Sequence, residues 1–288
     1  MNYGVARVLS VMSAAAIHLI TLAWRVYMST ILYEDENHKC IKFEGLTAEG
    51  EIPSNQFLIV HNRRGLLLDC GGYRVYKTIL GEMAHFLPAG SLDYIFLSHQ
   101  DPDIGSGINL WLPICNAKIL VSALWERFVP AFCVRGIAEG RLFPIPDQGV
   151  RFQLSDAPLM AIAAHFLHSP GNFHLYDPVA KILFTSDLGA SVAAHKAVID
   201  TDDDFRLHIE NMRGFHNRYM PSNTACRNWA AMVRKLDVEM IVPQHGAHIV
   251  GKSLVETFYQ WVETEKTALD DFGDELFQLP NEEVVTIL

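Results

Sequence analysis

One segment sets the interpretation of the whole chain: Leu92-Asp93-Tyr94-Ile95-Phe96-Leu97-Ser98-His99-Gln100-Asp101-Pro102-Asp103-Ile104-Gly105. Its first six residues are mostly apolar and have the composition of a buried strand, whereas proline and glycine interrupt the remainder. A loop at a strand end can direct an imidazole at 99 and carboxylates at 101 and 103 into one small volume. The segment therefore predicts a metal-binding loop. A polar turn, with aspartates bonded to their own backbone, is the alternative.

The same pattern recurs at three later points in the chain. Short apolar segments are followed by His168, Asp187 and His245, each with glycine or serine nearby. Taken singly, each is better explained as a turn or cap residue, but four such strand ends are hard to explain that way. Two metal ions can share the combined set if one carboxylate bridges them. The candidate ligands are His99, Asp101, Asp103, His168, Asp187 and His245.

Composition limits the class of protein. The 288 residues are half hydrophobic, which suits one large domain, expected over residues 33–288. The net charge of −10 without a basic block argues against a nucleic-acid partner. The five cysteines are dispersed and form no Cys-x-x-Cys pair, so we expect neither a disulfide framework nor thiolate metal ligands. A reducing, cytoplasmic compartment is the simplest expectation.

Residues 1–32 are interpreted as an apolar N-terminal extension. The run from Val8 to Trp24 is shorter than the ~20 residues a spanning helix needs, and it contains His18. No clear cleavage site follows it, which argues against a signal peptide. We favour a packing helix or strand first, an artefact of an upstream start codon second, and a membrane segment third.

Strand and helix patterns alternate along the rest of the chain, which predicts an α/β fold. A polar turn over residues 62–65 between two apolar runs predicts a β-hairpin. Apolar periodicity predicts further strands and helices. The strands are expected at residues 40–43, 118–122, 150–154, 159–164, 181–185 and 239–243, and the helices at 73–86, 108–113, 123–132, 223–236 and 253–268.

The order of motifs resembles that of the metallo-β-lactamase fold superfamily over residues 40–268. The motifs are Leu-Leu-Asp-x-Gly-Gly, Ser-His-x-Asp-x-Asp, His-Ser-Pro-Gly-Asn, Thr-Ser-Asp and Pro-Gln-His-Gly. This resemblance implies a four-layer αββα sandwich with a dinuclear metal site at one edge of the two sheets.

The loop at His99 resembles one branch of that superfamily. Hydrolases carry His-x-His-x-Asp-His and flavodiiron reductases carry His-x-Glu-x-Asp-His, whereas this chain has Asp101, Asp103 and then Ile104. The loop is most similar to that of the oxygen-binding diiron proteins. The resemblance implies one iron held by His99, Asp101 and His168, the other by Asp103 and His245, and Asp187 as the bridge. Ile104 would leave a coordination position free and add an apolar wall.

Four neighbouring polar residues are weaker candidates for orienting ligands or donating a hydrogen bond to bound oxygen. Core packing or solvent exposure is the alternative for each of them. They are Gln100, His174, His216 and Tyr219.

The resemblance implies two iron ions, with zinc or manganese as alternatives, and O2 or NO as the ligand. O2 binding at a diferrous site would give a diferric peroxo species in an oxygen-sensing, oxygen-carrying or slow oxidoreductase role. No flavodoxin-like domain or in-chain FMN is expected, so turnover would need a separate electron donor. A signalling partner and a homodimer are further expectations. The alternative is a dinuclear metal-dependent hydrolase that acts on a phosphodiester, lactone or thioester.

Overall fold

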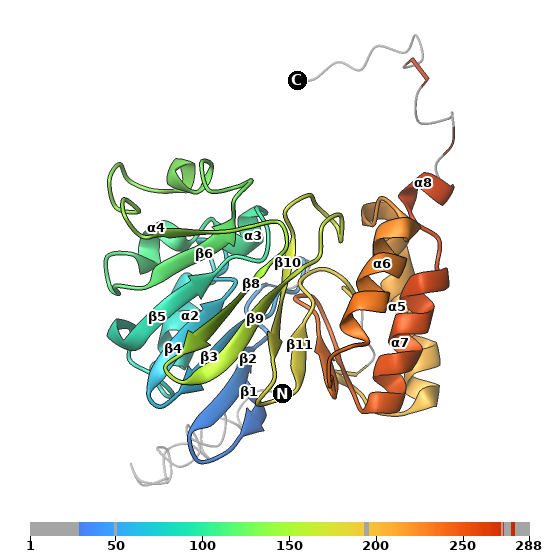
Figure 1. The fold of residues 1–288 in the computed structure, drawn as a ribbon, viewed down its shortest axis with the longest axis horizontal. Helices are drawn as coiled ribbons and strands as arrows, with labels where there is room; N and C mark the ends of the chain where they lie inside the picture. The colour runs from blue at the N-terminus through green and yellow to red at the C-terminus, as the bar shows by residue number, and fades with distance from the viewer. Residues whose placement is uncertain (1–28, 49–50, 193–195, 272, 274–277, 280–288) are drawn as a thin grey trace, which may run out of the picture.

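The computed structural model describes residues 29–48, 51–192, 196–271, 273 and 278–279. Two seven-stranded sheets pack face to face, and helices cover the outer face of each sheet (Figure 1). This four-layer arrangement confirms the predicted αββα fold. The apolar run at residues 8–24 lies outside the described residues. Within the described part of the chain, no helix is long and apolar enough to cross a membrane.

The first sheet follows the chain order, from β1 at one edge to β7 at the other. Strands β1 to β4 pair antiparallel, and strands β4 to β7 pair parallel, so β4 takes part in both kinds of pairing. The strands are β1 (Ser29–Glu34), β2 (His38–Phe43), β3 (Gln56–His61), β4 (Arg64–Leu68), β5 (Leu92–Phe96), β6 (Lys118–Ser122) and β7 (Leu142–Ile145). The accompanying helices are α2 (Tyr76–Met83), α3 (Pro102–Gly105) and α4 (Ile108–Trp111), with 3₁₀ turns η1 (Ala89–Ser91) and η2 (Val129–Phe132).

The second sheet has the strand order β12-β14-β13-β11-β10-β9-β8. Its strands are β8 (Val150–Leu154), β9 (Ala157–Ala163), β10 (Phe173–Asp177), β11 (Ile182–Phe184), β12 (Val198–Ile199), β13 (Met240–Val242) and β14 (His248–Val250). Its helices are α5 (Asp202–Tyr219), α6 (Asn223–Val233), α7 (Lys252–Thr264) and α8 (Ala268–Asp271). The pairing of β11 with β13 is parallel, so both strands end at the same edge of the sheet.

The sandwich has three hydrophobic layers: one between the two sheets and one between each sheet and its helices. The central strands are therefore buried on both faces. In β3, Phe57 and Ile59 face the second sheet, and Leu58 between them faces the helices on the outside. Side chains alternate across a strand, so a strand buried on both sides reads as a continuous apolar run. This explains the uninterrupted hydrophobic segments that predicted these strands.

The hairpin between β3 and β4 is confirmed. Asn62 and Arg63 form its two-residue turn, and both have positive φ, at 48° and 63°. Two left-handed residues in a two-residue loop give the type I′ turn, whose twist matches that of the flanking strands. The turn fixes the register that buries Leu66 and Leu68 between the sheets.

The structure corrects the predicted start of the domain and one helix. The boundary at residue 33 cuts through β1, because the strand begins at Ser29 and pairs with β2. The helix predicted at residues 123–132 is instead a series of turns ending in η2. Pro130 lacks the backbone N–H that a continuous helix would need at this position. The Trp125 side chain instead points to another segment, where its Nε1–H donates to the Pro170 carbonyl (2.9 Å).

Five strands, the one-turn helices α3 and α8 and most of helix α5 were not predicted. The five strands are short or contain polar residues, which obscures their alternation; they are β1, β7, β10, β12 and β14. The acidic turn at residues 200–204 opens α5, and the Thr201 hydroxyl caps this helix by accepting a hydrogen bond from the Asp204 amide (3.2 Å). The 18-residue length of α5 brings its C-terminal turn close to the predicted metal ligands.

Candidate metal centre

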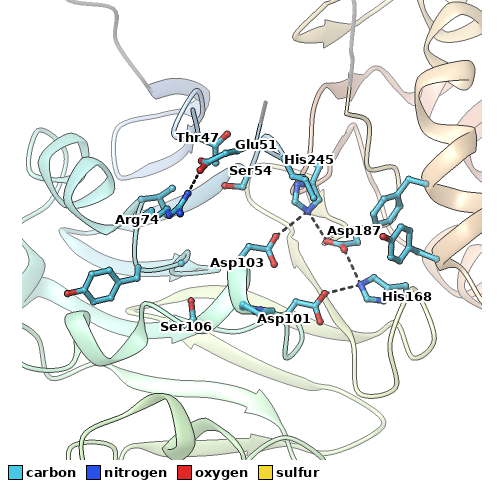
Figure 2. A pocket seen from close by; sticks show the side chains of 17 residues that line it. Thr47, Glu51, Ser54, Arg74, Asp101, Asp103, Ser106, His168, Asp187 and His245 are labelled. Carbon is cyan, nitrogen blue, oxygen red and sulfur yellow. Dashed lines mark hydrogen bonds and ion pairs between the residues drawn. The ribbon is translucent and has the colours of Figure 1, made fainter. Parts of the chain in front are cut away.

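All six predicted ligands meet at one edge of the sandwich, where strands from both sheets end. His99 follows β5, Asp187 follows β11 and His245 follows β13. Asp101 and Asp103 lie at the start of α3, and the loop between β9 and β10 supplies His168. All of them except His99 line one cavity, where Figure 2 shows their side chains directed toward one another.

The first half of the cluster contains four side chains. His168 Nε2 lies 3.1 Å from Asp187 Oδ2 and 3.4 Å from Asp101 Oδ2. His99 Nε2 lies 3.6 Å from Asp101 Oδ2 and 3.8 Å from Asp187 Oδ2. One ligand atom from each of the four falls within 4.8 Å of all the others, which is close enough to surround one ion.

The second half shares Asp187 with the first. His245 Nε2 lies 3.5 Å from Asp187 Oδ1 and 3.5 Å from Asp103 Oδ2. Asp187 therefore turns Oδ2 toward His168 and Oδ1 toward His245. A carboxylate that offers one oxygen to each half has the arrangement of a bridging ligand.

Two buried polar atoms of the cluster make no hydrogen bond, only ion-pair contacts of 3.5 Å or longer, and this tests whether the residues suit metal ions. Among the described residues, neither His99 Nε2 nor Asp187 Oδ1 has a hydrogen-bond partner. A buried polar atom left unpaired costs about 1–3 kcal/mol. Coordination to an ion would satisfy both atoms, so the donor set fits a dinuclear centre.

The other ring nitrogen of two histidines is fixed by neighbouring groups. His245 donates from Nδ1 to the carbonyl of Pro53 (2.5 Å), which leaves Nε2 free to bind an ion. His99 Nδ1 lies 3.0 Å from Ser186 Oγ and 3.1 Å from Ser98 Oγ. Such contacts orient the ring and select the tautomer of a metal-binding histidine.

The histidines of the cluster bind protons tightly in the absence of metal. Burial would lower the pKa of His168, but hydrogen bonds to Asp101 and Asp187 outweigh it and raise the pKa to about 9. Burial is likewise outweighed at His245, where Asp187 raises the pKa to about 9. The same histidines hold the pKa of Asp101 and Asp187 well below the ordinary range, although burial opposes this. Positive charge is therefore strongly favoured at this site.

Two of the predicted neighbouring residues lie at the centre. The Gln100 side chain donates from Nε2 to Asp101 Oδ1 (3.0 Å) and accepts from Ser169 Oγ (2.9 Å), so it holds Asp101 in place. Tyr219 lines the cavity, with its ring centroid 5.8 Å from that of His168.

The other three do not line the cavity, which corrects the role expected of Ile104 and agrees with core packing, the alternative given for His174 and His216. Ile104 is fully buried in the core between the first sheet and its helices, because the short helix α3 turns it inward, and it does not line the cavity. His174 accepts a hydrogen bond from Trp229 Nε1 (3.0 Å), and burial lowers its pKa to about 3. His216 packs on Trp261 at a centroid distance of 4.8 Å, away from the cavity lining.

Several groups at the site were not predicted from the sequence. Phe215 stacks on Tyr219 at 4.4 Å and forms the apolar wall that had been assigned to Ile104. The buried Asp69 accepts from the backbone N–H of Ser98 (2.8 Å) and from its hydroxyl (3.0 Å), which supports the strand end before His99. Asp69 stands in the Leu-Leu-Asp-x-Gly-Gly motif, which was the one available signal for its role.

The cavity over the centre has a volume of about 580 Å³. Its lining includes Glu51 and Arg74, which form an ion pair (Figure 2). The exposed Tyr73 also lines it. Asp101 and Asp103 are partly exposed to it, whereas the Asp187 side chain is only 6% exposed. The centre is therefore accessible to small molecules on its carboxylate side and enclosed at the bridge.

Comparison with known proteins gives a family match and close structural neighbours. The model of the ODP family beta lactamase matches residues 52–246. A solved structure described as the peroxy diiron species of chemotaxis sensor ODP is 40% identical, with a TM-score of 0.75, over 84% of this chain and 97% of that one. The apo state of chemotaxis sensor ODP from T. denticola has the same identity and coverage, with a TM-score of 0.74.

More distant matches include a solved structure with the same fold and a curated relative matched by sequence. Rubredoxin oxygen:oxidoreductase from Desulfovibrio gigas is 16% identical, with a TM-score of 0.68, over 81% of this chain and 61% of that one. An uncharacterized protein of Methanocaldococcus jannaschii is 24% identical over 211 residues, which are 72% of this chain and 52% of that protein. The chain spans about half the length of the curated relatives that it matches.

Proposed function

The chain belongs to the ODP family of β-lactamase-like proteins, and we propose that it holds two iron ions and binds dioxygen. The observation that carries the proposal is the position of Asp187, which turns one oxygen to each half of a six-residue cluster. Support also comes from the 40% identity to the chemotaxis sensor ODP, of which a peroxy diiron species has been solved.

We infer that His99, Asp101 and His168 hold one ion, that Asp103 and His245 hold the other, and that Asp187 bridges them. Structural zinc sites are usually tetrahedral with nitrogen or thiolate ligands, whereas carboxylate-rich sites with open positions suit iron. When bound, the ions would supply electrons and coordination positions for dioxygen. The hydrolase alternative has less support, because Asp101 stands where the hydrolases of the superfamily carry histidine.

The surrounding residues have three roles in this proposal. Pro53 and Ser186 orient the imidazoles so that Nε2 faces the ions. Gln100 holds Asp101 by a hydrogen bond. The stacked rings of Phe215 and Tyr219 keep water from one side of the centre, which favours a small, neutral ligand.

The partner and the setting of the protein are also proposals. We infer that electrons come from a separate donor, and that the state of the centre is passed to another protein as a signal. The open cavity beside Asp101 and Asp103 would give an electron donor access to the centre. All five cysteines are free in the described part of the chain, which supports a reducing, cytoplasmic compartment.

The test is to load the protein with Fe(II) without oxygen, count the metal by elemental analysis, and record the optical spectrum as air is admitted. We expect about two iron ions per chain and a new visible charge-transfer band after exposure to air. Two bound iron ions without any band would contradict the proposal. Purification with zinc, together with turnover of an ester or phosphodiester, would favour the hydrolase instead.

A further inference from the structure

A second cluster of metal-type side chains lies at the opposite edge of the sandwich. His38 and Cys40 stand two residues apart at the start of β2, and Asp177 ends β10. β2 runs parallel to β5, since two antiparallel pairings separate β2 from β4 and β4 is parallel to β5. The start of β2 is therefore at the edge remote from the end of β5, where His99 lies. β10 is antiparallel to β11, so Asp177 is likewise remote from Asp187.

Three different ligand atoms converge in this cluster. His38 Nε2 lies 2.7 Å from Asp177 Oδ2. Cys40 Sγ lies 3.3 Å from the same oxygen and 3.6 Å from His38 Nε2. All three residues are at most 1% exposed. They meet because alternate residues of β2 face the second sheet, which brings His38 and Cys40 against β10.

The second nitrogen of His38 is also fixed by a neighbour. His38 Nδ1 lies 3.1 Å from His61 Nδ1, and His61 Nε2 lies 2.9 Å from Oδ1 of the exposed Asp156. These contacts orient the His38 ring with Nε2 toward Cys40 and Asp177.

We propose that His38, Cys40 and Asp177 bind one divalent transition-metal ion of the zinc class, separate from the dinuclear centre. The ion would take the place of the proton between His38 Nε2 and Asp177 and of the thiol proton that Cys40 donates to Asp177. With the metal on His38 Nε2, His38 would donate from Nδ1 to His61, and His61 would donate from Nε2 to Asp156, so every contact keeps a donor and an acceptor. Metal-binding histidines regularly use their second nitrogen in this way.

The distances are close to those that such an ion needs. Zinc binds sulfur at about 2.3 Å and nitrogen at about 2.0 Å, so a tetrahedral site separates these two ligand atoms by about 3.5 Å. The Cys40 to His38 distance of 3.6 Å matches this. The distance from His38 to Asp177 must widen by about 0.6 Å, from 2.7 Å, as the shared proton is replaced.

Charge and chemistry also match a zinc-class ion. A divalent cation would neutralise one thiolate and one carboxylate, which are costly to bury unpaired. Mixed sulfur, nitrogen and oxygen ligands suit zinc better than magnesium or calcium. The spacing His38-x-Cys40 lies outside the usual Cys-x-x-Cys pattern, which explains why the sequence pointed away from a thiolate site. Such an ion would tie β2 of one sheet to β10 of the other.

The test uses a spectroscopic property that the dinuclear centre lacks. The intact chain is titrated with Co²⁺ and, separately, with Zn²⁺, and bound metal is counted after removal of excess ion. We expect a sulfur-to-cobalt charge-transfer band, because Cys40 is a ligand here and the six residues of the dinuclear centre contain no sulfur. The band should persist in Asp187→Asn, which disables only the dinuclear centre.

Two variants and a matched control complete the design. Cys40→Ala should abolish the band and lower bound metal by about one ion per chain, and Asp177→Asn should weaken binding at least tenfold. Cys226→Ala removes another fully buried cysteine, which lies on α6 in a different hydrophobic cluster from Cys40, and should change neither measurement. A wild-type protein without the sulfur band, or a band that survives Cys40→Ala, would overturn the proposal. These results do not depend on iron or dioxygen binding, so the two proposals fail separately.

Discussion

Metal binding at the dinuclear centre should release protons in a number that the structure specifies. With a pKa of about 9, His168 and His245 are each about 99% protonated at pH 7, so each ion must displace about one proton from Nε2. The pKa of His99 is also raised, because Asp187 and Asp101 outweigh its burial, and this adds to the number. We therefore expect at least about two protons per chain. Apparent affinity should rise about tenfold for each pH unit between 7 and 8.5 for each ion.

The assay is calorimetric titration of the metal-free protein in buffers of different ionisation enthalpy, or direct pH measurement in weak buffer. His168→Ala should lower the count by about one proton. Tyr219→Phe, whose ring lies beside His168 without being a ligand, should leave it unchanged. Release of fewer than one proton per chain, or affinity that does not vary with pH, would refute the idea that ions replace protons on these histidines.

Three further predictions concern stability. The raised pKa of His168 and His245 stabilises the metal-free fold fully below pH 6.5, and this stabilisation is lost as the pH rises through about 9. The Tm of the metal-free protein should therefore fall across that pH range more than the Tm of the metal-loaded protein. Equal falls in the two Tm values would contradict this. Gly246→Ala should lower the free energy of unfolding, measured in urea, by at least about 2 kcal/mol, because φ is +84° and a Cβ would lie 2.0 Å from Ser191 Oγ. The control is Gly214→Ala, at an open site that should tolerate alanine. Thr201→Ala should cost about 1 kcal/mol by removing the α5 cap, and Thr201→Ser should cost much less; equal losses would argue against the cap.

The sequence could predict the position of those site residues that stand next to a recognisable strand. His99, Asp187 and His245 each stand three residues after the end of a short apolar strand, so their positions at a common edge follow from the fold. The four-layer fold itself is confirmed. The assignment of individual ligands to metal stays a prediction, which the geometry supports.

The parts that could not be predicted depend on contacts between distant segments. Nothing local to Pro53 indicates that its carbonyl meets His245, which is 192 residues away. Phe215 reaches the centre only because α5 is long and packs beside the loop of His168. Ile104 was misplaced because the sequence does not show which way a four-residue helix turns its side chains.

The origin of the ligands in both sheets makes iron occupancy a measure of folding. The residues come from segments between positions 99 and 245, and Asp187 completes both halves only when the two sheets have docked. Neither half can form in a partly assembled sandwich, so binding energy acts on the whole fold. An ion present at a hundred times its Kd would add about 2.7 kcal/mol to the free energy of unfolding. Substitutions far from the centre that loosen either sheet should therefore lower metal content before they abolish the fold.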